Sequence, residues 1–141
     1  MSDTFNRLPD KPRPQPAAEN QAYWDGLREH RLLVQRCTAC EKLRFYPRPM
    51  CDGCYSLEYD WQQIDGRGTV HSWTVSHHPF HPGFKRDLPY VTVTADLDAG
   101  LRLQAPLAGN DIDALALDLP VVVDYTDVDD ALTLPCLRLA G

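Results

Sequence analysis

The chain has 141 residues, a hydrophobic fraction of 43% and a formal net charge of -6 at pH 7. This length gives room for one ordinary domain, or for a small metal-stabilised module beside a small barrel. The acidic balance argues against nucleic-acid binding, which needs a basic surface. No apolar run approaches the roughly 20 residues that span a bilayer, and no secretory signal is visible, so we expect a cytoplasmic protein without a membrane partner.

The first segment, residues 1–18, contains four prolines among mixed charges. Repeated proline removes amide donors and favours extended backbone. We therefore predict a Pro-rich arm rather than a helix. Two interpretations stay open: a disordered leader, or an arm that lies on a partner subunit.

Residues 19–30 are predicted to form a helix, because Tyr23, Trp24 and Leu27 make a narrow apolar stripe among polar residues. Gly26 weakens this helix. Short strands are expected at residues 31–36 and 43–46. The aromatic pair on the helix is interpreted as a packing anchor, with a protein interface as the alternative.

Four of the five cysteines form two Cys-x-x-Cys pairs with ten residues between them. The predicted ligands are Cys37, Cys40, Cys51 and Cys54. Such pairs can close a tetrahedral shell around one Zn²⁺, and two disulfides or free thiols are the alternatives. A closed shell leaves no open coordination position, so the zinc is predicted to be structural. Cys136, the fifth cysteine, is expected to be a buried, inert thiol.

Beyond the second cysteine pair the pattern changes to short alternating strands. The expected strands cover residues 68–76, 90–97, 101–107, 120–125 and 132–139. Asp127, Asp129 and Asp130 are expected to form the last turn. Five short antiparallel strands favour a closed OB-like barrel, because closure removes exposed edges and a β-sandwich needs more strands. The predicted fold is therefore mainly β, with the arm at 1–18, a helix and metal-binding ribbon at 19–60, and the barrel at 61–141.

Four histidines lie close together in the sequence: His71, His77, His78 and His81. They suggest a second metal site or a general base. No carboxylate accompanies them at a recognisable spacing, so we favour a loop at the barrel rim that contacts a partner or ligand.

Four runs of the sequence together resemble a known family. They are LVQRCTACEKLRFYPRPMCDGC, GRGTVHSWTVSHHPFHPGF, LPYVTVTADLDAGLRL and VDDALTLPCLRL. Over about residues 19–139 the chain resembles the acyl-CoA-associated OB-fold proteins with a rubredoxin-like zinc ribbon. The resemblance implies a helical segment, a zinc ribbon and a five-stranded OB-fold barrel, in that order. Where such ribbons often carry glycine after each cysteine pair, this chain has Glu41 and Tyr55.

The resemblance also implies a function in lipid or steroid metabolism, as a small subunit of a hetero-oligomer that handles acyl-CoA thioesters. Four basic residues of the barrel segment are candidates for binding the CoA phosphates, with ordinary surface charge as the alternative. They are Arg67, Lys85, Arg86 and Arg102.

We therefore expect a zinc-binding accessory subunit that associates with a thiolase-like enzyme, such as an aldolase, and helps bind acyl-CoA. No Ser-His-Asp arrangement or phosphate-binding glycine loop is recognisable, so we expect the chain not to be catalytic alone. A MaoC-like enoyl-CoA hydratase is the alternative partner. An OB module for single-stranded nucleic acid is the alternative of another class.

Overall fold

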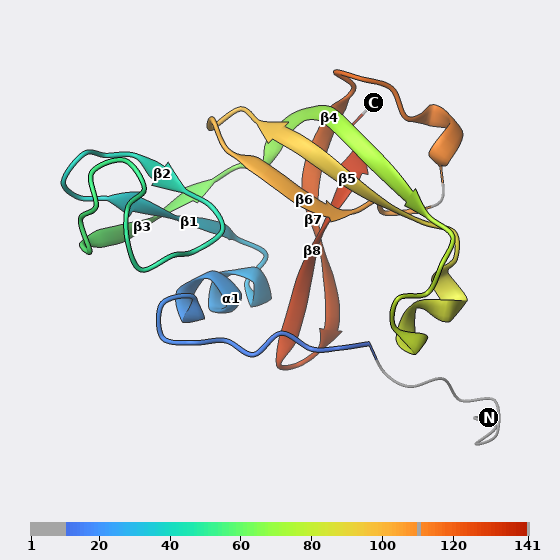
Figure 1. Ribbon diagram of the computed structural model, residues 1–141, viewed down its shortest axis with the longest axis horizontal. Helices are drawn as coiled ribbons and strands as arrows, with labels where there is room; N and C mark the ends of the chain where they lie inside the picture. Colours follow the sequence, from blue (N-terminus) through green and yellow to red (C-terminus); the bar gives the residue numbers. More distant parts are fainter. Residues whose placement is uncertain (1–10, 110, 141) are drawn as a thin grey trace.

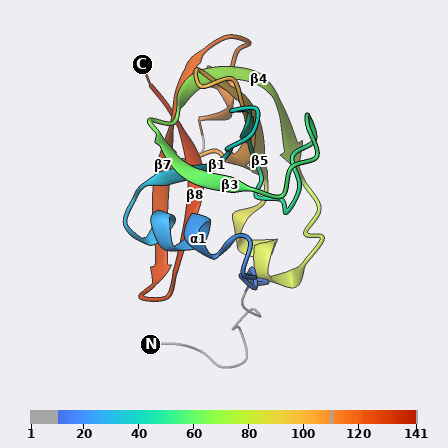
Figure 2. The same ribbon diagram turned by 90° about the vertical axis from the view of Figure 1, so that its left-hand side faces the viewer.

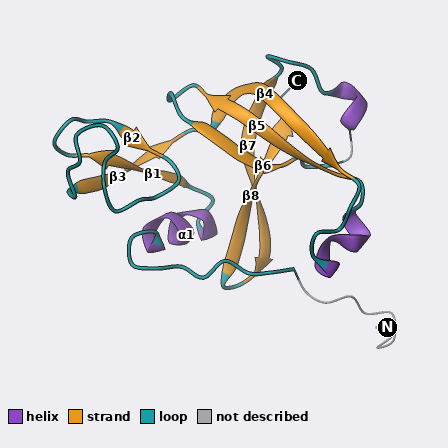
Figure 3. Ribbon diagram, viewed as in Figure 1, coloured by secondary structure: helices purple, strands orange, loops and turns teal. Residues whose placement is uncertain are grey.

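The computed structural model describes residues 11–109 and 111–140. A three-stranded sheet lies at one end of the molecule and a five-stranded barrel at the other, with the helix α1 below their junction (Figure 1). Strands and loops make up most of the described chain, and helices are short (Figure 3). The mainly β fold is as predicted.

The arm is described from residue 11 onward, and the part of it at 1–10 lies outside the described residues. Residues 11–17 have no regular secondary structure. Lys11 forms an ion pair with Asp87, and Arg13 Nη1 lies 2.9 Å from Asp129 Oδ2. The described part of the arm therefore lies along its own barrel.

Helix α1 spans Gln21–Arg28, two residues shorter at each end than predicted. It ends because His30 has a left-handed φ of 58°, and the carbonyl of Gly26 accepts the amides of Glu29 and Arg31, each at 2.9 Å. Packing explains the glycine at position 26, because a Cβ there would lie 2.9 Å from the side chain of Leu33. The glycine lets the helix approach the first strand closely.

The ribbon sheet has the order β2-β1-β3. Its strands are β1 (Leu32–Cys37), β2 (Leu43–Arg44) and β3 (Tyr59–Ile64). The sequence did not predict β3, which is half-exposed and carries three polar residues in six. It forms because it pairs along all of β1, from Leu32↔Ile64 to Cys37↔Tyr59.

The barrel has the strand order β6-β5-β4-β7-β8. The strands are β4 (Arg67–Ser76), β5 (Tyr90–Leu97), β6 (Arg102–Pro106), β7 (Pro120–Asp129) and β8 (Leu132–Leu139). A parallel bridge between Leu107 and Leu137 joins the ends of this sheet, and the Ala108 amide donates to the Leu137 carbonyl at 2.8 Å. The predicted five-stranded OB-fold is confirmed.

The strand β7 continues further than expected, through Asp127 to Asp129, because the pairing with β8 extends to Asp129↔Leu132. Only Asp130 and Ala131 form the turn. Two 3-10 helices lie in the connections between strands: η1 (Pro82–Asp87) and η2 (Ile112–Ala114).

The Gly-Arg-Gly run at the start of the barrel attaches it to the ribbon. Gly66 has a φ of 75°, and a Cβ there would lie 2.9 Å from Val123. A Cβ on Gly68 would overlap the backbone oxygen of Asp96 on β5. One hydrophobic core runs from Tyr23 and Leu27 of α1 into the barrel. Figure 2 shows α1 below the ribbon sheet and beside the β7–β8 hairpin.

Candidate functional site

The two cysteine pairs sit on two turns with the same backbone hydrogen bonds. In the first knuckle (residues 37–42), the Glu41 amide donates to the Cys37 carbonyl and the Cys37 amide donates to the Lys42 carbonyl, each at 2.9 Å. The second knuckle (residues 51–56) repeats both bonds from Tyr55 to Cys51 and from Cys51 to Ser56, each at 2.9 Å.

The residue after each pair has left-handed backbone, with a φ of 69° at Glu41 and 66° at Tyr55. The turn that often uses glycine is therefore made without it.

The four cysteine sulfurs of the two knuckles lie close together in space. All lie within 4.8 Å of one another, and the shortest Sγ–Sγ distances are 3.5 Å (Cys37–Cys54) and 3.6 Å (Cys40–Cys51). A tetrahedron with Zn–S bonds of about 2.3 Å has edges of about 3.8 Å. The spacing fits a shared metal, and it is too long for a disulfide bond of about 2.05 Å.

Backbone amides favour the thiolate form of two of the four cysteines, Cys51 and Cys37, whereas hydrogen bonds with the other cysteine side chains raise the pKa of Cys54. The amides of Cys54 and Gly53 lower the pKa of Cys51 to about 6, and the Gly53 amide lies 3.4 Å from its sulfur. The amide of Cys40 likewise lowers the pKa of Cys37. Thiolates are the form that binds zinc, so the turn geometry and the donor set agree. Cys136 lies apart from the cluster, buried in β8 as predicted.

The four basic candidates for phosphate binding lie in two separate regions of the barrel. Arg67 and Arg102 lie near the start of the β4–β5 hairpin, where Gly68 pairs with Leu97 and Asp96 pairs with Arg102. Lys85 and Arg86 lie in η1, beyond the other end of that hairpin. The ten-residue strand β4, about 30 Å long at about 3.3 Å per residue, lies between the two pairs along the chain. One phosphate group cannot contact all four.

The clustered histidines are also divided. His71 lies on β4, with Nδ1 3.3 Å from Asp96 Oδ2, and this carboxylate also accepts from Arg102 Nε at 2.7 Å. His81 Nδ1 accepts the Gly83 amide at 3.0 Å and so begins η1. His77 and His78 are exposed in the same loop. Within the described ranges, the cysteines are the only group of three or more such side chains spaced to hold a metal.

An apolar groove of about 410 Å³ lies on the outer face of the barrel, next to η1. Its lining residues are Phe84, Tyr90, Thr92, Gln104, Ala105, Pro106, Leu134 and Pro135. The rings of Phe84 and Tyr90 are 5.5 Å apart and tilted by 32°. The groove crosses β5 and β6, the face with which OB-folds usually bind ligands. Its size is within the range of small-molecule pockets.

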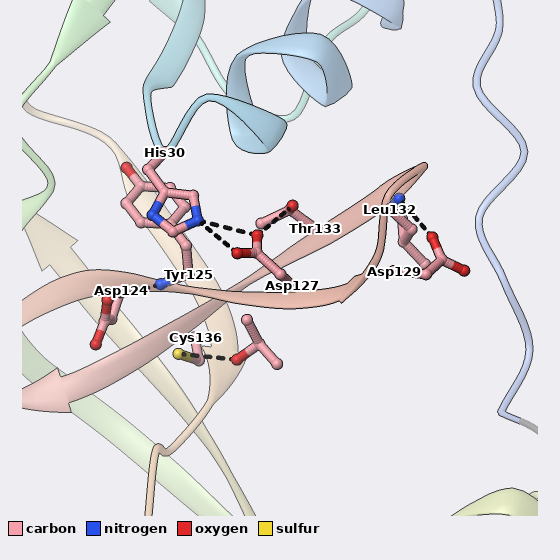
Figure 4. A network of polar contacts seen from close by, with 9 residues as sticks. His30, Asp124, Tyr125, Asp127, Asp129, Leu132, Thr133 and Cys136 are labelled. Atoms are coloured by element: carbon pink, nitrogen blue, oxygen red, sulfur yellow. Dashed lines mark hydrogen bonds and ion pairs between the residues drawn. The ribbon is translucent and has the colours of Figure 1, made fainter.

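Sequence reasoning missed a polar contact between the turn that follows α1 and the barrel (Figure 4). His30 Nε2 lies 2.9 Å and 3.1 Å from the two carboxylate oxygens of Asp127, and the Thr133 hydroxyl donates to the same carboxylate at 2.7 Å. The His30 ring stacks on Tyr125 at 5.0 Å. No local signal could have predicted it, because His30 and Asp127 are 97 residues apart. The contact holds the end of the helix against β7.

Fold and site together define a protein with a four-cysteine zinc ribbon followed by an OB-fold. Family comparison agrees: residues 24–60 match the family described as "ChsH2, rubredoxin-like zinc ribbon domain", and residues 61–126 match "ChsH2, C-terminal OB-fold domain". The chain belongs to the ChsH2/DUF35 family.

Three similar proteins place the chain within this family. A "Probable enoyl-CoA hydratase alpha subunit" of Thermomonospora curvata is 39% identical over 130 residues, which cover 92% of this chain and 40% of that protein. The "3-oxo-4,17-pregnadiene-20-carboxyl-CoA hydratase alpha subunit" of Mycobacterium tuberculosis is 35% identical over 118 residues, or 84% of this chain and 37% of that protein. The chain thus spans about two fifths of these curated relatives.

A solved structure named "Ltp2-ChsH2(DUF35) aldolase" matches with a TM-score of 0.81 and 39% identity. The match covers 92% of this chain and 100% of that one. In the described part of the chain, no helix combines the length and the apolar character needed to cross a membrane.

Proposed function

We propose that this chain is a non-catalytic accessory subunit that binds a thiolase-like aldolase acting on acyl-CoA substrates. The observation that supports it most is the match to the ChsH2(DUF35) aldolase chain, which is covered over its full length at 39% identity. A ribbon and an OB-fold of this extent therefore occur together in an aldolase. The Mycobacterium tuberculosis relative is named for a pregnadiene carboxyl-CoA. We take a steroid-derived or other lipid thioester as the substrate class.

In this proposal Cys37, Cys40, Cys51 and Cys54 hold one structural Zn²⁺. The ion would supply folding energy, since four protein ligands fill its coordination shell. The sulfur spacing and the amide donors described above support this assignment. Catalysis then belongs to the partner subunit.

The groove beside η1 is the proposed contact with acyl-CoA. Phe84 and Tyr90 supply an apolar wall, and Gln104 supplies a polar group within it. Lys85 and Arg86 follow Phe84 in η1, and in this proposal they would bind the phosphate groups of CoA. Arg67 and Arg102 lie at the far end of the hairpin and would need a separate site.

A MaoC-like enoyl-CoA hydratase is the second candidate partner, because the curated relatives at 39% and 35% identity are named hydratase alpha subunits. The shared region is only about two fifths of those subunits, which favours the aldolase. The acidic charge of -6 disfavours single-stranded nucleic acid. A cytoplasmic location stays a prediction.

Co-expression with each candidate partner tests the proposal. Size-exclusion chromatography with light scattering should show the chain eluting in a complex with the thiolase-like aldolase. A complex with the hydratase alone would transfer the proposal to the alternative partner. A salt-dependent mobility shift with a labelled oligonucleotide, without either complex, would support the nucleic-acid class instead.

A further inference from the structure

The two knuckles have the same backbone hydrogen bonds, but the side chains that they present to solvent differ in chemical character. In the first knuckle the left-handed residue is Glu41, whose carboxylate lies 2.6 Å from Arg36 Nη2. In the second knuckle the equivalent residue is Tyr55, whose side chain is 72% exposed. Among the described residues, no ring or hydrogen-bond partner contacts the Tyr55 side chain. One knuckle thus carries a solvated ion pair, and the other presents an aromatic ring to solvent.

The residues that flank the two knuckles can be compared in the same way, because the backbone hydrogen bonds match. In the first knuckle, Arg36 immediately before Cys37 pairs with Leu43, which lies six residues after Cys37. The matching hydrogen bonds place Met50 opposite Leu57 in the second knuckle. Met50 is 46% exposed and Leu57 65% exposed. Met50, Tyr55 and Leu57 are thus three exposed apolar side chains within or next to the second knuckle, and we treat them together as its apolar patch.

The backbone of Tyr55 gives a second reason to assign a role to this ring. A φ of 66° is the left-handed region, which glycine adopts freely and other residues adopt at a cost. Neither packing within the chain nor backbone preference accounts for an exposed tyrosine at this position. The ribbon loops form the end of the molecule farthest from the barrel (Figure 1). The patch is therefore open to a large partner.

We infer that Met50, Tyr55 and Leu57 of the second knuckle are the surface with which this chain docks on the thiolase-like subunit. This inference rests on the proposed function. The Glu58 carboxylate beside the patch is exposed and forms no ion pair or hydrogen bond within the described ranges. The proposed zinc, held by four thiolates, would add negative charge nearby. The docking site on the partner is accordingly an apolar surface with lysine or arginine at its rim.

Two matched variants test the inference, because the same change can be made on both knuckles. Tyr55→Gly removes the ring and suits the left-handed backbone, so the variant should keep its zinc and its fold. Glu41→Gly makes the same backbone change on the first knuckle and serves as the control. Isothermal titration of each zinc-loaded chain with the thiolase-like aldolase measures the effect.

We expect Tyr55→Gly to weaken binding about tenfold or more, Leu57→Ser to weaken it similarly, and Glu41→Gly to bind like the wild type. Wild-type affinity for both Tyr55→Gly and Leu57→Ser would overturn the docking surface while leaving the proposed function in place. Failure of the wild-type chain itself to bind the aldolase would overturn the proposed function, and this surface with it.

Discussion

Replacing Cys51 with serine removes one of the four sulfurs and should unfold the ribbon while the barrel stays folded. The Cys51 side chain is fully buried, and its sulfur lies 3.6 Å from Cys40 Sγ within the cluster. Structural zinc contributes roughly 10–16 kcal/mol to small zinc modules, whereas whole domains are stable by about 5–15 kcal/mol. The ribbon strands have only six, two and six residues. We expect a loss above about 3 kcal/mol in the free energy of unfolding of the ribbon.

Hydrogen exchange resolves this prediction by region. In the Cys51→Ser variant, the amides of Cys37 and Glu41, which close the first knuckle, should lose protection. Barrel amides such as Leu107, which donates to the Val91 carbonyl at 3.0 Å, should keep it.

Cys136→Ser is the matched control, because Cys136 is buried outside the cluster. It should cost about 1–3 kcal/mol and retain one zinc by native mass spectrometry. A metal-free Cys51→Ser variant with wild-type protection in both knuckles would refute a structural metal.

Three further changes test other parts of the account. Gly68→Ala forces a methyl group onto the β5 backbone and should lower the melting temperature by an amount equivalent to about 1–3 kcal/mol. In the control variant Gly100→Ala, the added Cβ would meet open space, so the melting temperature should fall less despite the φ of 91°. The Thr133 hydroxyl and the His30 ring lower the pKa of Asp127, so its contribution to stability is present above the unfolded-state pKa of about 3.9 and is lost as the pH falls through the lower folded value. The stability difference between the wild type and Asp127→Asn should therefore shrink in acid, and a constant difference down to pH 2 would contradict the contact. Phe84→Ala should weaken acyl-CoA binding by the assembled complex several-fold in a titration, and an unchanged affinity would remove the groove from the site.

Much of the fold could be predicted because its signals are local. Alternating residues mark β5, where Val91, Val93 and Ala95 point into the core, and the cysteine spacing marks the ribbon. The strand β3 has a weaker signal, because Tyr59 and Trp61 alternate with polar residues but are only partly buried, and Gln63 breaks the alternation. Its pairing with β1, rather than its own pattern, determines that it is a strand.

The site was predictable only where its residues are close in sequence. The cysteines of each pair have only two residues between them, and their turn brings them together. The separation of Arg67 from Lys85 depends on the strand β4 between them, which spacing alone does not reveal. The burial of Arg44, 2% exposed with its guanidinium 5.1 Å from the Tyr59 ring, also runs against the usual exposure of arginine.

The most direct test of the account is whether this zinc-loaded chain binds a thiolase-like aldolase. Isothermal titration at physiological salt should give saturable binding with a defined stoichiometry, and the complex should persist through gel filtration. A folded, zinc-loaded chain that does not bind the aldolase would contradict the central claim.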